Sequence, residues 1–340
     1  MKIKFSRRGA IKTMGLALGS SLLARVAQAS PTDWVLGFGS CMNARKNQSF
    51  WQAILGRRFD HWVFLGDNLY PEVDNLEYLT RAYSELENVQ PLKELVARVP
   101  VSATWDDHDF GADNADGSLP YKYESMKLFR TFWKQDYASE SDGVYSAQIV
   151  EHQGRKIHLI LLDLRFNRTP HGEFAPVNSE SDEMKSAAAP QLLGETQWQW
   201  LESEFEKQAD IRIVCSSIQV LSHEHRFEKW KNYPAEYERL MGLVGRNSAP
   251  TVFLSGDRHL HEVSRVQLVS GRTLYDFTSS GLNKAAGLSR FERNRLRVQR
   301  SLDDGFGELR LTWIEGVPKL TMSMIDKDGQ QRFSQFDFLV

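Results

Sequence analysis

The chain lacks the features that mark several classes of protein. It has two cysteines, Cys41 and Cys215, among 340 residues, which excludes a small fold held together by disulfides. Hydrophobic residues make up 41% and charged residues 25%, and this composition excludes a disordered or fibrous chain. No stretch approaches the ~18 consecutive apolar residues of an ordinary membrane-spanning helix. A globular protein remains, long enough for one large or two ordinary domains.

The chain also has no excess of basic over acidic residues once its N-terminal segment is set aside. Residues 1–29 carry six Lys and Arg residues and no acidic residue, whereas the rest of the chain has 36 basic and 44 acidic residues. A protein that binds polyanions by releasing their counterions is expected to be basic. We therefore expect that nucleic acid is not the main partner.

The familiar patterns of nucleophilic and nucleotide-binding sites are absent as well. The segment from Gly37 to Cys41 lacks the final glycine of a G-x-S-x-G nucleophile elbow and the third glycine of a dinucleotide-binding loop. The chain also has no G-x-x-x-x-G-K-[ST] phosphate-binding loop. Any catalysis must therefore depend on other groups.

Residues 1–29 resemble a twin-arginine (Tat) signal peptide. Arg7 and Arg8 precede a short apolar stretch that ends in an Ala-Gln-Ala sequence, the small-residue pattern of a cleavage site. The alternative is a basic amphipathic helix. If the segment is a signal, residues 30–340 form the mature catalytic domain, the Tat export machinery is a partner, and the protein is periplasmic or secreted. We expect this mature protein to be a monomer.

Short apolar runs alternate with amphipathic stretches along the mature chain. The runs end in turn residues and are too short for buried helices, so they predict buried strands at 35–39, 61–66, 99–105, 157–163, 211–216 and 251–256. Helical patterns cover 76–86, 90–97, 121–137, 196–208 and 235–244, and alternating strands follow at 263–269, 273–278, 308–313 and 319–324. With no repeat and no linker, this order predicts one α/β domain with packed sheets.

Polar residues follow four of these predicted strands. They are Ser40 and Cys41, then Asp67, Asn68 and Tyr70, then Asp106 to Asp109, and finally Asp257 to His259. Ligands of open α/β sheets bind beyond the carboxyl ends of the strands. Carboxylates, imidazoles, a thiol and a phenol gathered there need a positive charge, which a metal ion supplies. The alternative for the acidic stretch around His108 is a solvated surface loop.

Cys41 and Tyr70 bear on the identity of such a metal. A thiolate and a phenolate together favour a redox-competent or strongly Lewis-acidic ion, and a phenolate ligand indicates ferric iron. The sequence also allows a Cys41–Cys215 disulfide in an exported protein.

The ordered set of short motifs resembles the PhoD-like (alkaline phosphatase D) group of the metallophosphatase superfamily. The motifs that carry the resemblance lie between residues 39 and 281: Gly39-Ser40-Cys41, Gly66-Asp67-x-x-Tyr70, Thr104 to Asp109, Leu162 to Arg165, Ser216 to Val220, Glu228-Lys229-Trp230, Ser255 to His259 and Ser279-Ser280-Gly281. The resemblance implies a four-layer α/β/β/α sandwich with two packed mixed sheets and a two-metal site at the strand ends.

The resemblance also implies which residues hold the metals. Cys41, Asp67, Tyr70 and His259 would hold Fe³⁺, with Asp67 bridging to a second ion, expected to be Ca²⁺. Asp257 and either Asp107 or Asn114 would complete the second site. Asp107 is favoured, because it precedes His108 as an asparagine precedes a histidine in the wider superfamily. Zn²⁺ or Mn²⁺ are the alternative metals.

The implied activity is hydrolysis of a phosphate monoester or diester, either a small molecule or the headgroup of a polymer or lipid. Metal-bound hydroxide would attack phosphorus while His108 stabilises charge or protonates the leaving oxygen, and Asp106 or Asp109 would orient the ring. Arg165 would hold the phosphate with its planar guanidinium, in competition with Arg258. The alternative for Arg165 is an ion pair with Asp163 or another acid.

Two other functions are compatible with the sequence. The first is a phospholipase or phosphodiesterase with an apolar rim around the site, for which four aromatic residues are candidates: Trp105, Phe110, Trp230 and Tyr233. The second is a protein that binds metal and phosphate without turnover.

Overall fold

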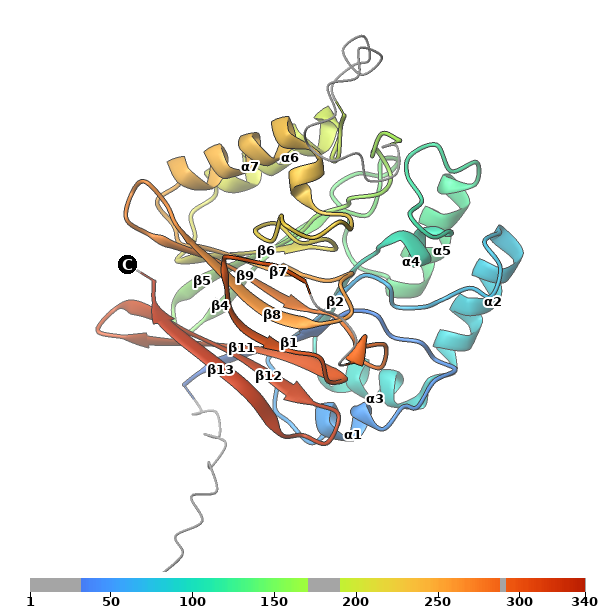
Figure 1. Cartoon of the computed structure of the whole chain (residues 1–340), viewed down its shortest axis with the longest axis horizontal. Helices are drawn as coiled ribbons and strands as arrows, with labels where there is room; N and C mark the ends of the chain where they lie inside the picture. The colour runs from blue at the N-terminus through green and yellow to red at the C-terminus, as the bar shows by residue number, and fades with distance from the viewer. Residues whose placement is uncertain (1–31, 171–189, 288–291, 340) are drawn as a thin grey trace, which may run out of the picture.

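The computed structural model describes residues 32–170, 190–287 and 292–339, and it shows two mixed β-sheets packed face to face (Figure 1). Residues 1–29, the predicted export signal, lie outside the described residues. Three clusters of buried hydrophobic residues define the layers: one between the sheets and one between each sheet and its helices. The structure therefore has the predicted four-layer α/β/β/α architecture.

The first sheet has six strands in the order β13-β12-β11-β1-β2-β3. Their bounds are β1 Trp34–Gly39, β2 His61–Leu65, β3 Val101–Thr104, β11 Gly305–Ile314, β12 Val317–Asp326 and β13 Gln331–Phe338. β1, β2 and β3 run parallel, and the other neighbours pair antiparallel.

The second sheet has seven strands in the order β10-β8-β9-β7-β6-β5-β4. Their bounds are β4 Ser146–His152, β5 Arg155–Leu161, β6 Ile211–Ser216, β7 Thr251–Ser255, β8 His261–Gln267, β9 Thr273–Ser279 and β10 Arg297–Ser301. β5, β6, β7 and β9 run parallel. The carboxyl ends of these four strands therefore meet at one edge of the sheet.

Helices cover the outer faces of the two sheets (Figure 1). On the first sheet these are α1 Phe50–Leu55, α2 Leu76–Glu87, α3 Gln90–Arg98, the short α4 Asp107–Phe110 and α5 Lys122–Trp133. On the second they are α6 Glu195–Glu206 and α7 Pro234–Arg246, preceded by the 3₁₀ turn η2 Trp230–Asn232. No helix in the described ranges is both long and apolar enough to cross a bilayer.

The apolar runs form strands because both faces of the inner strands are buried. In β2, Trp62 and Phe64 pack toward the helices, while Val63 and Leu65 pack between the sheets. The sequence did not predict β4, β10 and β13, which are all edge strands. Edge strands expose more of their surface and so lack a continuous apolar run.

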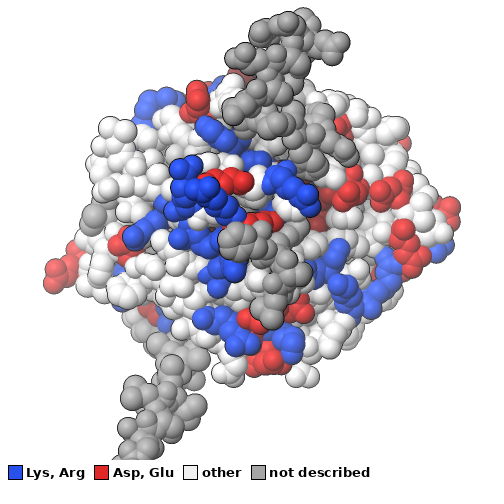
Figure 2. Space-filling model, viewed as in Figure 1, with Lys and Arg blue, Asp and Glu red and all other residues white. Residues whose placement is uncertain are grey.

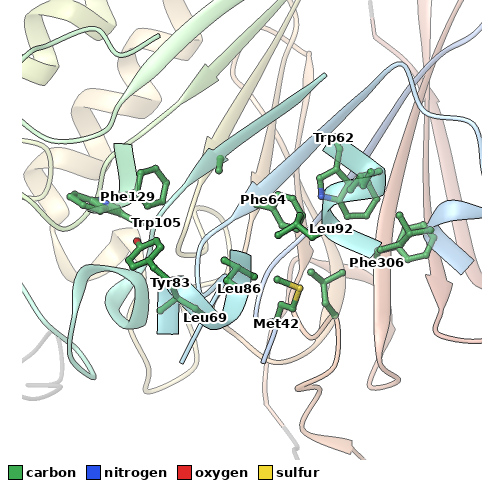
Figure 3. Packing of buried hydrophobic residues seen from close by; sticks show 14 of the residues in the cluster. Met42, Trp62, Phe64, Leu69, Tyr83, Leu86, Leu92, Trp105, Phe129 and Phe306 are labelled. Carbon is green, nitrogen blue, oxygen red and sulfur yellow. The ribbon is translucent and has the colours of Figure 1, made fainter. Parts of the chain in front are cut away.

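The core beneath the first sheet anchors the loops at its strand ends. Figure 3 shows Met42, Leu69 and Trp105 in this packed cluster with Phe64 and Tyr83. These three core residues lie in the chain beside the polar residues that follow β1, β2 and β3. Their packing fixes the positions from which those polar side chains project.

Opposite charges lie close together on the face shown in Figure 2, where basic side chains gather near the centre with acidic ones among them. Among the described residues, Arg293 and Arg295 both pair with Glu224, at 3.2 and 2.9 Å. The charge of this surface is therefore locally compensated.

Candidate metal centre

Four of the predicted ligands occupy an unusual backbone conformation just after a strand. Cys41 follows β1, Asp67 follows β2, and Asp257 and His259 follow β7, with φ angles of 59°, 52°, 65° and 53°. This left-handed region is costly for residues other than glycine, and such strain concentrates at functional sites. The backbone at these strand ends is therefore held in a conformation typical of functional sites.

Glycines allow the strand ends to approach closely. A Cβ atom on Gly66, whose φ is 96°, would lie 2.6 Å from the Cβ of Asp106, and one on Gly256 would lie 2.7 Å from Oγ of Ser40. An isolated parallel bridge between Ser40 and Ser280 joins the two sheets at the same edge. Polar residues from both sheets converge there as a result.

The structure brings two groups of donor atoms together around Asp67. The candidate ligand atoms of Cys41, Asp67 and His259 lie within 4.8 Å of one another, and so do those of Asp67, Asp107 and His108. Tyr70 joins them, because its hydroxyl donates to Oδ2 of Asp67 at 2.6 Å. Asp67 belongs to both groups, as a carboxylate between two adjoining metal sites would.

Asp257 lies beside these groups, outside both of them. Its Oδ2 atom is buried and accepts no hydrogen bond from the described residues, and Nη1 of Arg258 is 3.6 Å away. Burial raises the pKa of Asp257 to about 6, although Arg258 opposes the shift. An uncompensated carboxylate oxygen is what a nearby cation would use.

Burial works against the charged forms of the central donors. It raises the pKa of Cys41, Asp67 and Tyr70, and the carboxylate of Asp107 adds to the shift at Asp67. Burial acts in the same direction on Asp107, but Arg165 and His108 outweigh it and lower the pKa of that carboxyl overall. A thiol, a phenol, imidazoles and carboxylates in this setting fit one or two metal ions, which would neutralise the charge of their ionised forms.

The structure distinguishes Asp107 from Asn114 as a candidate for the second site. The Asp107 carboxylate lies within the donor groups, whereas Asn114 is exposed and its amide donates to Oδ2 of Asp113 at 2.8 Å. The backbone N–H of Asn114 donates to Oδ2 of Asp107 at 2.7 Å. The backbone of Asn114 thus supports the carboxylate of Asp107.

His108 lies at the site, but its ring has different neighbours from those expected. The ring centroid is 4.3 Å from that of Tyr70, and Nε2 is 3.7 Å from Oδ1 of Asp113. Within the described residues the ring makes no hydrogen bond to Asp106 or Asp109: its Nδ1 atom has no partner, Asp106 accepts from Arg165, and Asp109 accepts backbone N–H groups. The expectation that Asp106 or Asp109 orients the ring was therefore wrong. Burial lowers the pKa of His108, which favours the neutral imidazole.

Arg165 is placed behind the site and not facing a substrate. Its side chain is 0% exposed, with Nε donating to Oδ1 of Asp106 at 2.6 Å and Nη2 to Oε2 of Glu228 at 2.7 Å. These ion pairs are the alternative to phosphate binding that the sequence allowed, and their acids are Asp106 and Glu228. Asp163 accepts from the backbone N–H of Arg165 and not from its side chain. Arg258 is also buried and pairs with Glu292.

The geometry supports neither a disulfide at Cys41 nor an apolar rim of aromatic residues. Cys41 and Cys215 are both free and buried, and Sγ of Cys41 lies 3.1 Å from Oγ of Ser280. The aromatic residues considered for the rim are all packed in the interior: Trp105, Phe110, Trp230 and Tyr233.

Sequence reasoning missed Lys284, which lies on the loop after β9. Its Nζ atom is 3.1 Å from the centroid of the Tyr70 ring. Burial lowers the pKa of Lys284, while Asp67 and Cys41 act to raise it. A single lysine in a loop carries no sequence signal, and only its position three residues after Gly281 links it to a recognised motif.

A comparison with known protein families identifies the family to which this chain belongs. The family model described as PhoD-like phosphatase matches residues 72–301, more than half of the chain. The chain belongs to the PhoD-like phosphatase family. This membership makes it a phosphoesterase of the hydrolase class. Cys41, Asp67 and Tyr70 precede the matched stretch, so their place in the site of this PhoD-like phosphatase depends on the structure.

Solved structures share the fold of this PhoD-like phosphatase. The structure of PhoD aligns with a TM-score of 0.70 at 16% identity, over 91% of this chain and 69% of that one. A purple acid phosphatase from seeds of yellow lupin, Lupinus luteus, aligns with a TM-score of 0.58 at 13% identity, over 91% of this chain and 54% of that one. No curated protein sequence matches the chain.

Proposed function

We propose that this protein hydrolyses phosphate mono- and diesters in the manner of alkaline phosphatase D. The observation that carries the proposal is the pair of donor groups that share Asp67, one with a thiol and one that includes the imidazole of His108. Such an arrangement suits phosphoryl transfer, which needs positive charge near the phosphoryl oxygens and a group that manages the proton of the leaving oxygen.

The proposed roles follow the contacts of each residue. Cys41, Asp67, Tyr70 and His259 would hold Fe³⁺, and Asp67, Asp107 and Asp257 would hold Ca²⁺, with Zn²⁺ or Mn²⁺ as alternatives. Bound together, such ions neutralise phosphoryl charge and lower the pKa of a water molecule. His108 stabilises charge on the leaving oxygen or protonates it. The buried pairs of Arg165 with Asp106 and Glu228 hold the strand-end loops in position.

The proposal includes the cellular setting expected from the N-terminal residues. The protein would pass through the Tat machinery and act in the periplasm or outside the cell, as a monomer, on a small-molecule phosphate ester. A lipid substrate is less well supported, because the four aromatic residues considered for an apolar rim are buried.

A direct test uses protein produced with its signal region intact, whose metals are measured by elemental analysis. We expect turnover of p-nitrophenyl phosphate and of bis-p-nitrophenyl phosphate, and loss of both activities on chelation. The ratio of the two rates distinguishes a monoesterase from a diesterase. Tight binding of phosphate without turnover of either compound, with metal bound, would support a binding protein instead.

Replacing Tyr70 with Phe tests the proposed ferric site. We expect the wild-type protein to show a visible absorption band from tyrosinate-to-iron charge transfer, and Tyr70→Phe to lose it, because the phenol oxygen is removed. The ring that packs on His108 is kept. The spectrum is recorded at matched iron content, and an unchanged band in the variant would contradict phenolate ligation.

A further inference from the structure

The loop that follows β9 is fixed on the segments that carry Cys41 and His259. The backbone N–H groups of Gly281 and Leu282 both donate to the carbonyl oxygen of Ser40 at 3.0 Å. The N–H of Ala286 donates to the carbonyl of His259 at 2.8 Å. The two ends of this short loop are therefore held by the backbone of Ser40, next to Cys41, and by the backbone of His259 itself.

The residues on either side of Lys284 are also tied down. The side chain of Asn283 accepts from the N–H of Asn43 at 2.8 Å and donates to its carbonyl at 2.9 Å. The N–H of Ala285 donates to Oδ1 of Asp304 at 2.9 Å. Because both neighbours are anchored, the backbone position from which the Lys284 side chain extends is set by the fold.

Lys284 offers an ammonium group that forms no salt bridge with any described carboxylate, although Asp67 attracts it at longer range. It is half-buried, its Nζ lies over the ring of Tyr70, and it makes no hydrogen bond or ion pair with another described residue. The two arginines expected to bind phosphate differ, since Arg165 and Arg258 are buried and paired with carboxylates. Of these three basic residues, Lys284 is thus the one whose side chain is available to bind an anion.

We propose that Lys284 binds the phosphoryl group of the substrate through its nonbridging oxygens. Lys284 and His108 both contact the Tyr70 ring, which places them at the same donor groups. A fixed ammonium attracts a dianion more strongly than a monoanion, so Lys284 favours phosphate monoesters over diesters. This inference rests on the proposed function, because it assigns one residue to that site.

The test compares the metal-loaded wild type with Lys284→Met, which keeps an unbranched side chain but removes the charge. We expect inorganic phosphate to bind ~10- to 100-fold more weakly to the variant, as measured by calorimetry, since a charged hydrogen bond is lost. KM for p-nitrophenyl phosphate should rise, and the ratio of monoester to diester kcat/KM should fall. Lys284→Arg should restore part of the phosphate affinity.

The matched control is Lys93→Met, which removes an exposed lysine from α3 on the outer face of the first sheet. We expect its phosphate affinity to stay within about twofold of the wild type. Unchanged phosphate binding in Lys284→Met would overturn the proposal, and so would an equal loss in both variants. Loss of metal in Lys284→Met would also overturn the proposal, because Lys284 would then stabilise the metal ligands and not bind the phosphoryl group.

The phosphate measurement separates the two proposals. If the wild type binds phosphate, Lys284→Met binds it more weakly and neither turns over an ester, the role of Lys284 stands and the proposed hydrolysis fails. If esters are hydrolysed and the two proteins bind phosphate equally, the hydrolysis stands and the role of Lys284 fails.

Discussion

Replacing Asp67 with Asn is expected to lower turnover by at least ~10³-fold and to empty both metal sites. The reason is that Asp67 belongs to both donor groups, so a single carboxylate supports two positions. Losing the several kcal/mol that metal ions contribute to the transition state corresponds to several factors of ten in rate. The measurements are elemental analysis of the purified variant and kcat on p-nitrophenyl phosphate.

The same variant should behave differently without metal. Burial and the neighbouring acids raise the pKa of Asp67, so its carboxylate is destabilising when no cation is present. Metal-free Asp67→Asn should therefore melt at or above the temperature of the metal-free wild type. Added metal should raise the melting temperature of the wild type only.

The control for Asp67 is Asp136→Asn, the same change at an exposed position. It should retain metal, turnover and the metal-dependent rise in melting temperature. Full metal content in Asp67→Asn would show that the bridging assignment is incorrect.

Replacing His108 with Ala is expected to lower kcat by ~10²- to 10⁴-fold, the range for a lost acid or base, with metal content unchanged. Burial lowers the pKa of His108, and its Nδ1 atom accepts or donates no hydrogen bond within the described chain. A neutral imidazole so placed can stabilise a leaving oxygen by donating a hydrogen bond from its N–H, whereas protonating that oxygen requires the imidazolium form. The loss should be larger for an alkyl phosphate than for p-nitrophenyl phosphate, whose leaving group needs less help from an acid.

The competing role for His108 is that of a ligand, because its ring lies within 4.8 Å of candidate ligand atoms of Asp67 and Asp107. Elemental analysis distinguishes the two roles. If metal content falls in parallel with kcat in His108→Ala, and the loss is equal for both leaving groups, His108 holds metal and is not the acid.

Much of the fold could be predicted because burial leaves a pattern in the chain. Strands such as β2, covered on both faces, appear as apolar runs, and the polar residues after them mark where each strand ends. Edge strands such as β4 and β13 were missed because they are only partly buried. The pattern of apolar residues reflects burial, and edge strands are less buried than inner strands.

The site was predictable only in outline, as Arg165 and Lys284 show. Arg165 lies near a strand end, like the residues around it, yet it is buried against Asp106 and Glu228, which are distant in the sequence. Lys284 has no motif of its own and reaches the site because Asn283 and Ala285 anchor its loop. Neither placement follows from sequence spacing, since each depends on contacts between separate segments.

The sequence by itself determined the apolar strands, their order and the type of donor that follows each one. The tertiary structure decided which donors meet: it grouped Asp107 and His108 with Asp67, and it left Cys41 and Cys215 unbonded. Hydrophobic patterning is local and can be recognised along the chain, because each side chain is buried or exposed according to its place in a strand or helix. Donor geometry is non-local, because it is fixed by φ angles, loop anchors and ion pairs that exist only after the two sheets have packed together.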